Sequence, residues 1–184
     1  MQPWTILAQK TLLDRKWLRI TEDSVRLPNG TIIDEFHVMH SPNWAAVIAV
    51  TPDRQIVMVE QYRHGLGRTS LELPSGVIDP GEQSLDAAKR ELFEETGYQA
   101  QNWVALVDVS PEPSRSTHRA FFFVAYGAER VGDARPEASE VINVRLLHVN
   151  NLLGQVVQGR MDHAAHLGAI LLADKRGYLE RTPQ

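Results

Sequence analysis

The sequence contains no cysteine among its 184 residues. A chain without thiols cannot form a disulfide framework, hold zinc through thiolates or use a cysteine nucleophile. Basic residues are in the minority as well, because 19 Lys and Arg residues stand against 23 Asp and Glu residues, for a net charge of −4. Binding along a nucleic-acid backbone needs a basic surface, so we expect no nucleic-acid partner.

Long apolar runs, internal repeats and low-complexity segments are also missing. No apolar stretch approaches the roughly 20 residues that span a bilayer, and residues 1–10 lack the apolar core of a signal peptide. We therefore expect a cytoplasmic protein without a membrane partner. With 43% hydrophobic residues the chain can bury a substantial core, and we expect a single domain over residues 1–184.

Apolar periodicity predicts β structure in the first third of the chain and near its centre. Pro28-Asn29-Gly30 is typical of a tight turn between two strands. The predicted strands are residues 17–21, 24–27, 31–39, 45–50, 56–62, 71–74, 103–109, 120–126 and 141–147, and two C-terminal helices are predicted over 149–157 and 161–173. The continuous apolar runs at 45–50 and 56–62 favour buried central strands of a mixed sheet.

The most informative stretch is residues 76–98, GVIDPGEQSLDAAKRELFEETGY. Its second half predicts a helix with Ser84 as the N-cap. Gly97 can adopt the left-handed conformation that ends such a helix.

Three carboxylates of this helix, Glu91, Glu94 and Glu95, fall within a sector of roughly 100°. They repel each other unless a cation lies among them. Mg²⁺ prefers oxygen ligands and is usually held by a few carboxylates together with substrate phosphates. The alternative is a solvated acidic face that Lys89 and Arg90 partly neutralise. We expect Glu95 to occupy an exposed position on this face.

The spacing of the whole stretch is more specific than its charge. Gly76 is followed by five residues and Glu82, then by seven residues and Arg90-Glu91, and the stretch continues with Leu92, any residue, Glu94-Glu95, any residue, Gly97 and a bulky residue. This pattern matches the Nudix box at every defined position, so the chain is identified as resembling the Nudix hydrolase superfamily.

A second set of residues resembles one branch of that superfamily, the ADP-ribose and nucleotide-sugar pyrophosphatases. The set comprises Gln61-Tyr62-Arg63, the run from Glu72 to Gly76, the N-terminal hairpin region and the C-terminal helix pair. Members of this branch have a proline beyond the box, and Pro113 is the counterpart here. Its surroundings, residues 111–116, differ from the Ser-Pro-Gly that is usual in ADP-ribose enzymes, so the resemblance indicates the nucleoside-diphosphate class as a whole.

The resemblance implies a fold and an assembly. The fold is an α/β/α Nudix sandwich around a mixed sheet over residues 44–184, and residues 1–43 form an additional antiparallel β region. In this branch the N-terminal sheet exchanges between the subunits of a homodimer. Trp4, Trp17 and Ile20 are consistent with such an interface, and equally with packing inside one subunit.

The resemblance also implies roles in cation binding. Glu91 and Glu95, one helical turn apart, are expected to bind Mg²⁺, for which Mn²⁺ is expected to substitute. Glu94 would bind a further metal ion or orient the others, and the Ser75 carbonyl would complete the set. Arg90 would pair with a box carboxylate such as Glu82 and hold it in place.

A general base is needed outside the box, and in this branch it is a glutamate in a loop before a late strand. Glu140 fits that position best, and Glu137 is the alternative. For the substrate we expect contacts from Arg63, Tyr62, Glu72 and Arg115, although the loop that contains Arg115 can equally be a simple connection. His163 and His166 are spaced like metal ligands, but without a partner ligand we expect ordinary packed or surface histidines.

These expectations combine into one function. The chain is predicted to hydrolyse the pyrophosphate bond of a nucleoside diphosphate sugar, such as ADP-ribose or GDP-mannose, to a nucleoside monophosphate and a sugar phosphate. The alternative within the superfamily is activity on dinucleoside polyphosphates or nucleoside triphosphates. The alternative of another class is a catalytically silent sensor of nucleotide sugars, which would not need the box carboxylates.

Overall fold

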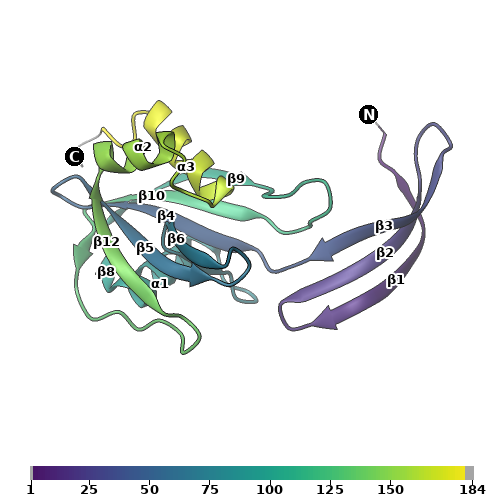
Figure 1. Ribbon diagram of the computed structural model, residues 1–184, viewed down its shortest axis with the longest axis horizontal. Coiled ribbons are helices and arrows are strands. Elements are labelled where there is room, and N and C mark those ends of the chain that lie inside the picture. Colours follow the sequence, from purple (N-terminus) through teal and green to yellow (C-terminus); the bar gives the residue numbers. More distant parts are fainter. Residues whose placement is uncertain (1, 181–184) are drawn as a thin grey trace. The chain divides into compact units, whose positions relative to one another are not determined.

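The computed structural model describes residues 2–180, and these residues divide into two units. One unit contains the residues up to Asn43 together with residues 110–119, and the other contains residues 44–109 and the chain from Ala120 onward. Figure 1 labels most of the strands and helices of both units.

The first unit is a three-stranded antiparallel sheet in the order β1-β2-β3. Its strands are β1 (Thr5–Arg15), β2 (Leu18–Arg26) and β3 (Ile32–His40). The predicted turn lies between β2 and β3, where Gly30 has a φ of 87° and donates its N–H to the Leu27 carbonyl at 2.9 Å. Residues 110–119 join this unit through the Met39 N–H, which donates to the Arg115 carbonyl at 2.8 Å.

Strand β1 was not expected as a separate strand. Two register shifts, between Ile6 and Ala8 and between Thr11 and Leu13, interrupt its pairing with β2. Each shift moves the side chains that follow to the other face of the sheet, so no period of two extends along the strand.

The second unit is built on a seven-stranded mixed sheet in the order β12-β5-β4-β10-β9, in which β6 also pairs with β5 and β7 with β4. The strands are β4 (Trp44–Val50), β5 (Gln55–Arg63), β6 (Arg68–Glu72), β7 (Ser75–Val77), β9 (Asn102–Val109), β10 (Ala120–Tyr126) and β12 (Ile142–His148). The helices are α1 (Ser84–Thr96), α2 (Val149–Val157) and α3 (Ala164–Lys175), and β8 (Tyr98–Gln99) pairs with β11 (Glu129–Arg130) in a small separate sheet. Strands β4 and β10 run parallel.

The central strand β4 explains the layered core. Ala45, Val47 and Ala49 pack into the cluster that also contains residues of α1. The alternate residues Ala46, Ile48 and Val50 pack into the cluster that contains residues of α2 and α3. Both faces of the strand are therefore buried, which is why its sequence is continuously apolar. Figure 1 shows α1 on one side of the sheet and α2 with α3 on the other, so the predicted α/β/α sandwich is confirmed.

Several predicted boundaries are wrong by a few residues. Ser84 is the first residue of α1 and Gln83 is its N-cap, without a side-chain cap hydrogen bond. Of the predicted strand 71–74 only residues 71 and 72 are in a strand, at the end of β6, and Pro74, which has no N–H for a ladder, lies between β6 and β7. Helix α3 begins at Ala164, after an extended His163. Among the described residues, none of these helices combines the length and the apolar composition needed to cross a bilayer.

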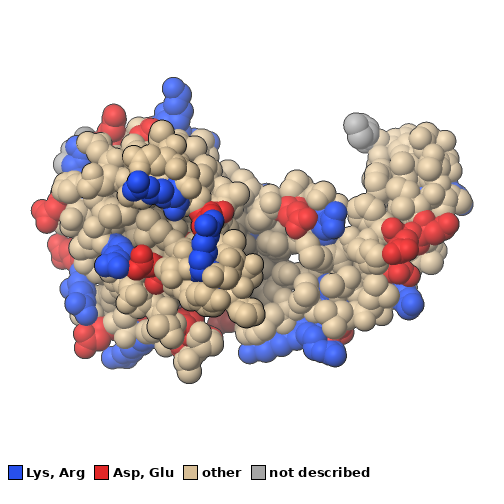
Figure 2. All heavy atoms as spheres, viewed as in Figure 1, with Lys and Arg blue, Asp and Glu red and all other residues tan. Residues whose placement is uncertain are grey.

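Charged side chains are mixed rather than segregated on the visible face of the second unit. Figure 2 shows Lys and Arg residues interspersed with Asp and Glu residues there. The pattern agrees with the near-balanced composition of 19 basic and 23 acidic residues.

Candidate functional site

Strand β7 and helix α1 contain most of the stretch 76–98, which lies in the second unit. Strand β7 pairs antiparallel with β4 and leads into the loop before α1. The helix ends as predicted at Gly97, which has a φ of 75° and donates its N–H to the Phe93 carbonyl at 2.7 Å. A side chain at Gly97 would also collide with the Gly132 carbonyl oxygen, 2.3 Å from an added Cβ.

Arg90 lies at the centre of the acidic residues of the box. Its Nε donates to Glu82 at 2.9 Å, and one Nη donates to Glu91 at 2.7 Å and to Glu94 at 3.0 Å. The other Nη donates to Glu82 at 3.0 Å and to the Val77 carbonyl at 2.9 Å. The pairing with Glu82 that we expected is therefore present. Because a guanidinium has five N–H groups, these five contacts use its full donor capacity and fix its orientation.

Glu91 packs directly against the backbone of Gly76. A Cβ built on Gly76 would lie 2.2 Å from Glu91 Oε1 and 2.6 Å from Oε2. The glycine is thus required by the close approach of the carboxylate. Burial raises the pKa of Glu91 to about 7, against the opposing effect of Arg90, and the Glu140 and Glu94 carboxylates raise it further.

Glu95 is buried, which corrects the expectation that it is exposed. Its relative exposure is 1%, because the carboxylate turns from α1 toward β7 and accepts the Ser75 N–H at 2.9 Å through Oε2. Its other oxygen, Oε1, is buried and makes no hydrogen bond among the described residues. Burial raises the pKa of Glu95 well above its usual value, and Glu91 and Glu140 add to this effect.

These observations fit a divalent cation. Burial and neighbouring carboxylates disfavour the ionised forms of Glu91 and Glu95, and Glu95 Oε1 makes no hydrogen bond among the described residues. Buried carboxylates are otherwise paired or bound to a metal. Because all the available donors are oxygen atoms, the site favours a hard cation such as Mg²⁺.

Arg63 and Glu72 form a second polar contact beside the carboxylates. Arg63 Nε donates to Glu72 Oε1 at 2.9 Å and Nη2 donates to Oε2 at 2.6 Å. Burial favours the neutral form of Glu72, but the bonds from Arg63 outweigh it and lower the pKa of Glu72. The Glu72 bonds raise the pKa of Arg63, and the Glu95 and Glu140 carboxylates add to that increase. Arg63 therefore interacts electrostatically with Glu95 and Glu140 as well as with its hydrogen-bond partner Glu72.

The loop that contains Glu137 and Glu140 is attached to the end of α1. The Arg135 N–H donates to the Glu94 carbonyl at 2.6 Å, and the Val131 N–H donates to the Gly97 carbonyl at 2.9 Å. The negative charge of Glu140 contributes to the raised pKa of both Glu91 and Glu95. Glu140 also accepts the Glu137 N–H at 3.0 Å.

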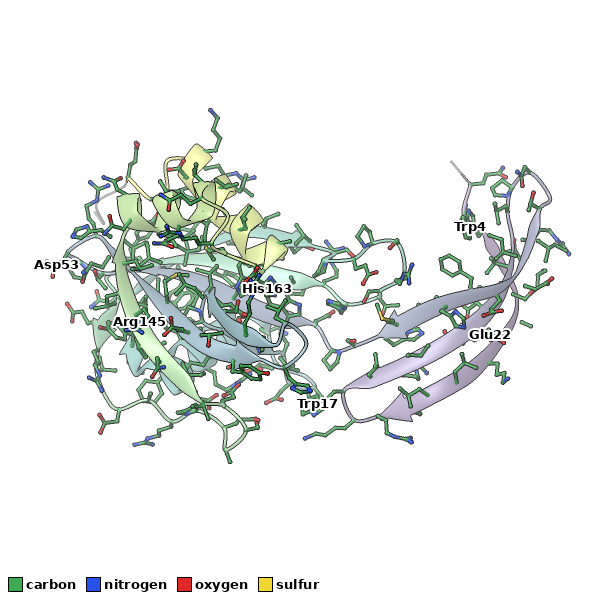
Figure 3. The ribbon with its side chains drawn as sticks, viewed as in Figure 1. Trp4, Trp17, Glu22, Asp53, Arg145 and His163 are labelled. Carbon is green, nitrogen blue, oxygen red and sulfur yellow. The ribbon has the colours of Figure 1, made fainter. Side chains whose placement is uncertain are left out.

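Tyr62 and Arg115 are the two remaining residues that were predicted to contact the substrate. Tyr62 is on β5 next to Arg63, with a relative exposure of 60%. Arg115 belongs to the first unit, where it forms an ion pair with Glu112 at 3.4 Å. Figure 3 labels Trp4 and Trp17, which also belong to the first unit.

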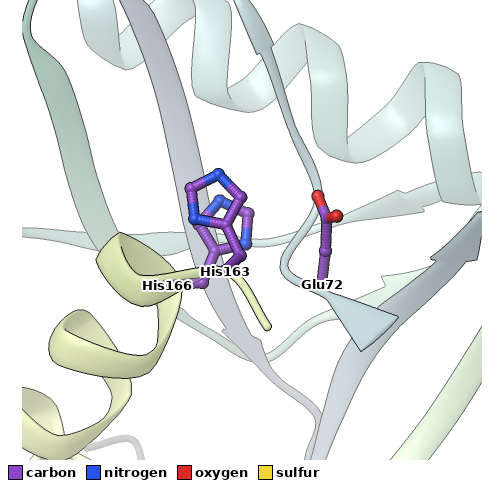
Figure 4. A group of neighbouring side chains, drawn as sticks. All are labelled: Glu72, His163 and His166. Carbon is purple, nitrogen blue, oxygen red and sulfur yellow. The ribbon is translucent and has the colours of Figure 1, made fainter. Parts of the chain in front are cut away.

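The two histidines do have a carboxylate neighbour, which the sequence did not reveal. One ligand atom from each of Glu72, His163 and His166 lies within 4.8 Å of the others. Figure 4 shows the two imidazoles face to face at the start of α3, beside Glu72. However, both Glu72 oxygens already accept bonds from Arg63, and His166 Nδ1 accepts the Leu73 N–H at 3.2 Å. A neutral imidazole that accepts at Nδ1 carries its proton on Nε2, so His166 has no free lone pair for a metal ion.

Comparisons with known proteins agree with this geometry. The NUDIX domain family matches residues 39–167, and the nucleoside diphosphate sugar hydrolase N-terminal domain family matches residues 4–39. The chain is 38% identical over 133 residues to an ADP-ribose pyrophosphatase of Mycobacterium tuberculosis, covering 72% of this chain and 63% of that protein. It is 34% identical over 119 residues to an ADP-ribose pyrophosphatase of Bacillus subtilis, covering 65% of this chain and 64% of that protein. The chain thus spans somewhat less than two thirds of these relatives.

A solved structure shares the fold. A crystal structure of an ADP compounds hydrolase aligns with a TM-score of 0.86 at 20% identity, and the alignment covers 100% of this chain and 98% of that chain. The family match covers well over half of the sequence and includes the whole box. The chain therefore belongs to the Nudix family, as the spacing of residues 76–98 indicates.

Proposed function

We propose that this protein is a divalent-metal-dependent pyrophosphatase of nucleoside diphosphate sugars, with ADP-ribose as the first substrate to test. The observation that carries the proposal is the buried pair of carboxyl groups of Glu91 and Glu95. Glu91 packs against Gly76, and Glu95 accepts the Ser75 N–H through Oε2 while its Oε1 has no hydrogen-bond partner among the described residues. The names of the relatives, ADP-ribose pyrophosphatases in two organisms, support the substrate class.

The proposed chemistry follows from charge. Glu91 and Glu95, with Glu94 and the Ser75 carbonyl, would hold Mg²⁺, which supplies positive charge that neutralises the diphosphate and favours ionisation of the attacking water. Arg63 would bind a phosphate oxygen, because a guanidinium pairs with phosphate in a forked geometry. Water attacks one phosphorus, the bridging P–O bond breaks, and the leaving phosphate keeps the bridging oxygen. The products are a nucleoside monophosphate and a sugar phosphate.

We assign the general base to Glu140. Its electrostatic influence on Glu91 and Glu95 supports a position near the attacked phosphorus, where it would accept the proton of the water. Glu140→Gln should lower kcat by about 100-fold, within the range of a lost general base, with little change in the Kd for Mg²⁺. Glu137→Gln is the matched control, because Glu137 is in the same loop. A large kcat loss in Glu137→Gln alone would move the base to that residue.

The N-terminal sheet is proposed to mediate a homodimer in which this sheet is exchanged. Its exposed apolar side chains support the proposal, and they are Trp4, Ile6, Leu7, Leu12, Trp17 and Ile32. Burying such side chains against a second copy would be favourable. Sedimentation of the full chain as a monomer at micromolar concentration would contradict it.

The substrate class is tested with the full chain, Mg²⁺ and a panel of substrates. The panel contains ADP-ribose, GDP-mannose, other nucleotide sugars, dinucleoside polyphosphates and nucleoside triphosphates, with products identified by mass. We expect cleavage of the sugar-linked diphosphates to a nucleoside monophosphate and a sugar phosphate. Cleavage of polyphosphates alone would place the chain in another branch of the family, and binding without cleavage would indicate a sensor.

A further inference from the structure

The turn between β6 and β7 connects the two polar groups of the proposed site. Glu72 ends β6 and holds Arg63 through two hydrogen bonds, and Ser75 begins β7 and donates its N–H to Glu95. Only Leu73 and Pro74 lie between them. Any displacement of this turn would therefore move the partner of Arg63 and the partner of Glu95 together.

The turn has few backbone groups that can anchor it. Pro74 has no N–H, and its carbonyl accepts the Val47 N–H at 3.1 Å. The Leu73 N–H is the remaining donor, and it is buried in a fully covered residue. Its partner is His166 Nδ1 at 3.2 Å, from α3 and 93 positions away in the sequence.

The His166 ring is rigidly placed for this contact. The side chain has a relative exposure of 0%, and its imidazole stacks on that of His163 with ring centroids 3.8 Å apart and planes 11° apart. Trp44 and Phe122 contact it at centroid distances of 5.4 and 5.8 Å. Burial lowers the pKa of His166 well below its usual value, and the nearby His163 and Arg63 add to this effect. The ring is therefore neutral and keeps a lone pair at Nδ1.

We propose that His166 is a positioning residue for the hydrolysis, because its Nδ1 acceptor fixes the Leu73-Pro74 turn and through it Arg63 and Glu95. The inference rests on the proposed function for its catalytic consequence. It does not depend on any contact between His166 and the substrate. A protonated His166 would present an N–H toward the Leu73 N–H and could not hold the turn.

Two substitutions separate this role from simple packing. In His166→Asn the amide oxygen can occupy the place of Nδ1, since both are two bonds from Cβ. In His166→Gln the amide lies one bond farther out, near the place of Nε2, and no acceptor faces Leu73. Misplacing catalytic groups by about 1 Å can cost about 100-fold in rate. We therefore expect kcat to fall by about 10-fold or more in His166→Gln and to stay within about 3-fold in His166→Asn.

The measurement compares kcat and KM for ADP-ribose at saturating Mg²⁺, with thermal unfolding to confirm that both variants are folded at the assay temperature. A wild-type kcat in His166→Gln, or an equal loss in both variants, would overturn the proposal. ¹⁵N NMR of the imidazoles in the wild-type protein tests the contact without activity. The proton is expected on Nε2, and a proton on Nδ1 would refute the contact. A wild-type protein that cleaves none of the panel would refute the proposed function and the catalytic consequence, whereas the NMR result would still decide the contact.

Discussion

Glu95→Gln should reduce kcat by about 100-fold or more, which is the scale of losing one preorganised electrostatic contact to the transition state. The substitution keeps the shape of the side chain and an acceptor for the Ser75 N–H, but it removes the charge that would hold the cation. Steady-state assays on ADP-ribose over a range of Mg²⁺ concentrations measure the effect. Full activity at saturating Mg²⁺ would contradict the assignment of Glu95 as a ligand.

The same variant should not be less stable than the wild type when the metal is chelated. Because the pKa of Glu95 is raised in the folded protein, its ionisation costs folding free energy as the pH rises above the pKa of a free glutamate. A neutral glutamine avoids this cost, so urea unfolding at about pH 8 should give an equal or higher free energy of unfolding. Asp86→Asn is the matched control, because Asp86 is an exposed acid on the same helix and should leave activity unchanged.

Arg90→Met should lower both stability and activity. The substitution removes five hydrogen bonds and leaves Glu82, Glu91 and Glu94 without the cation that separates them. A broken buried pair costs about 3–5 kcal/mol, and the partial exposure of Arg90 reduces our expectation to about 2 kcal/mol. We expect kcat to fall by at least about 10-fold, because the carboxylates lose their fixed orientation.

A surface arginine provides the control for Arg90. Arg145, labelled in Figure 3, donates to Glu60 at 2.8 Å from an exposed position on β12. Exposed pairs contribute less than about 1 kcal/mol, so Arg145→Met should change the free energy of unfolding little and leave kcat unchanged. Equal effects of the two substitutions in urea unfolding would show that Arg90 acts only as a surface charge.

The box could be predicted from the sequence because its constraints are local. Each of three positions requires its residue type for a local reason. Gly76 leaves room for the Glu91 carboxylate, Arg90 supplies the positive charge among the carboxylates, and Gly97 adopts the left-handed conformation that ends the helix. The central strands were also predictable, since burial on both faces of β4 leaves a continuous apolar run.

Contacts between distant segments were not predictable. The helical sector of Glu95 shows which side of α1 it occupies, but not that β7 covers that side and buries it. The partners Leu73 and His166 are 93 positions apart, and no local pattern links them. The Glu72 carboxylate beside His163 and His166 was missed for the same reason, because only the folded chain brings the end of β6 next to the start of α3.

The most direct test of a cation site in the box is calorimetric titration of the metal-free full chain with Mg²⁺. The site predicts binding to the wild-type protein, at least about 10-fold weaker binding to Glu95→Gln, and unchanged binding to His163→Gln, which alters the group of Glu72, His163 and His166. Equal affinity in the wild type and Glu95→Gln, or a loss confined to His163→Gln, would contradict a cation held by the box carboxylates.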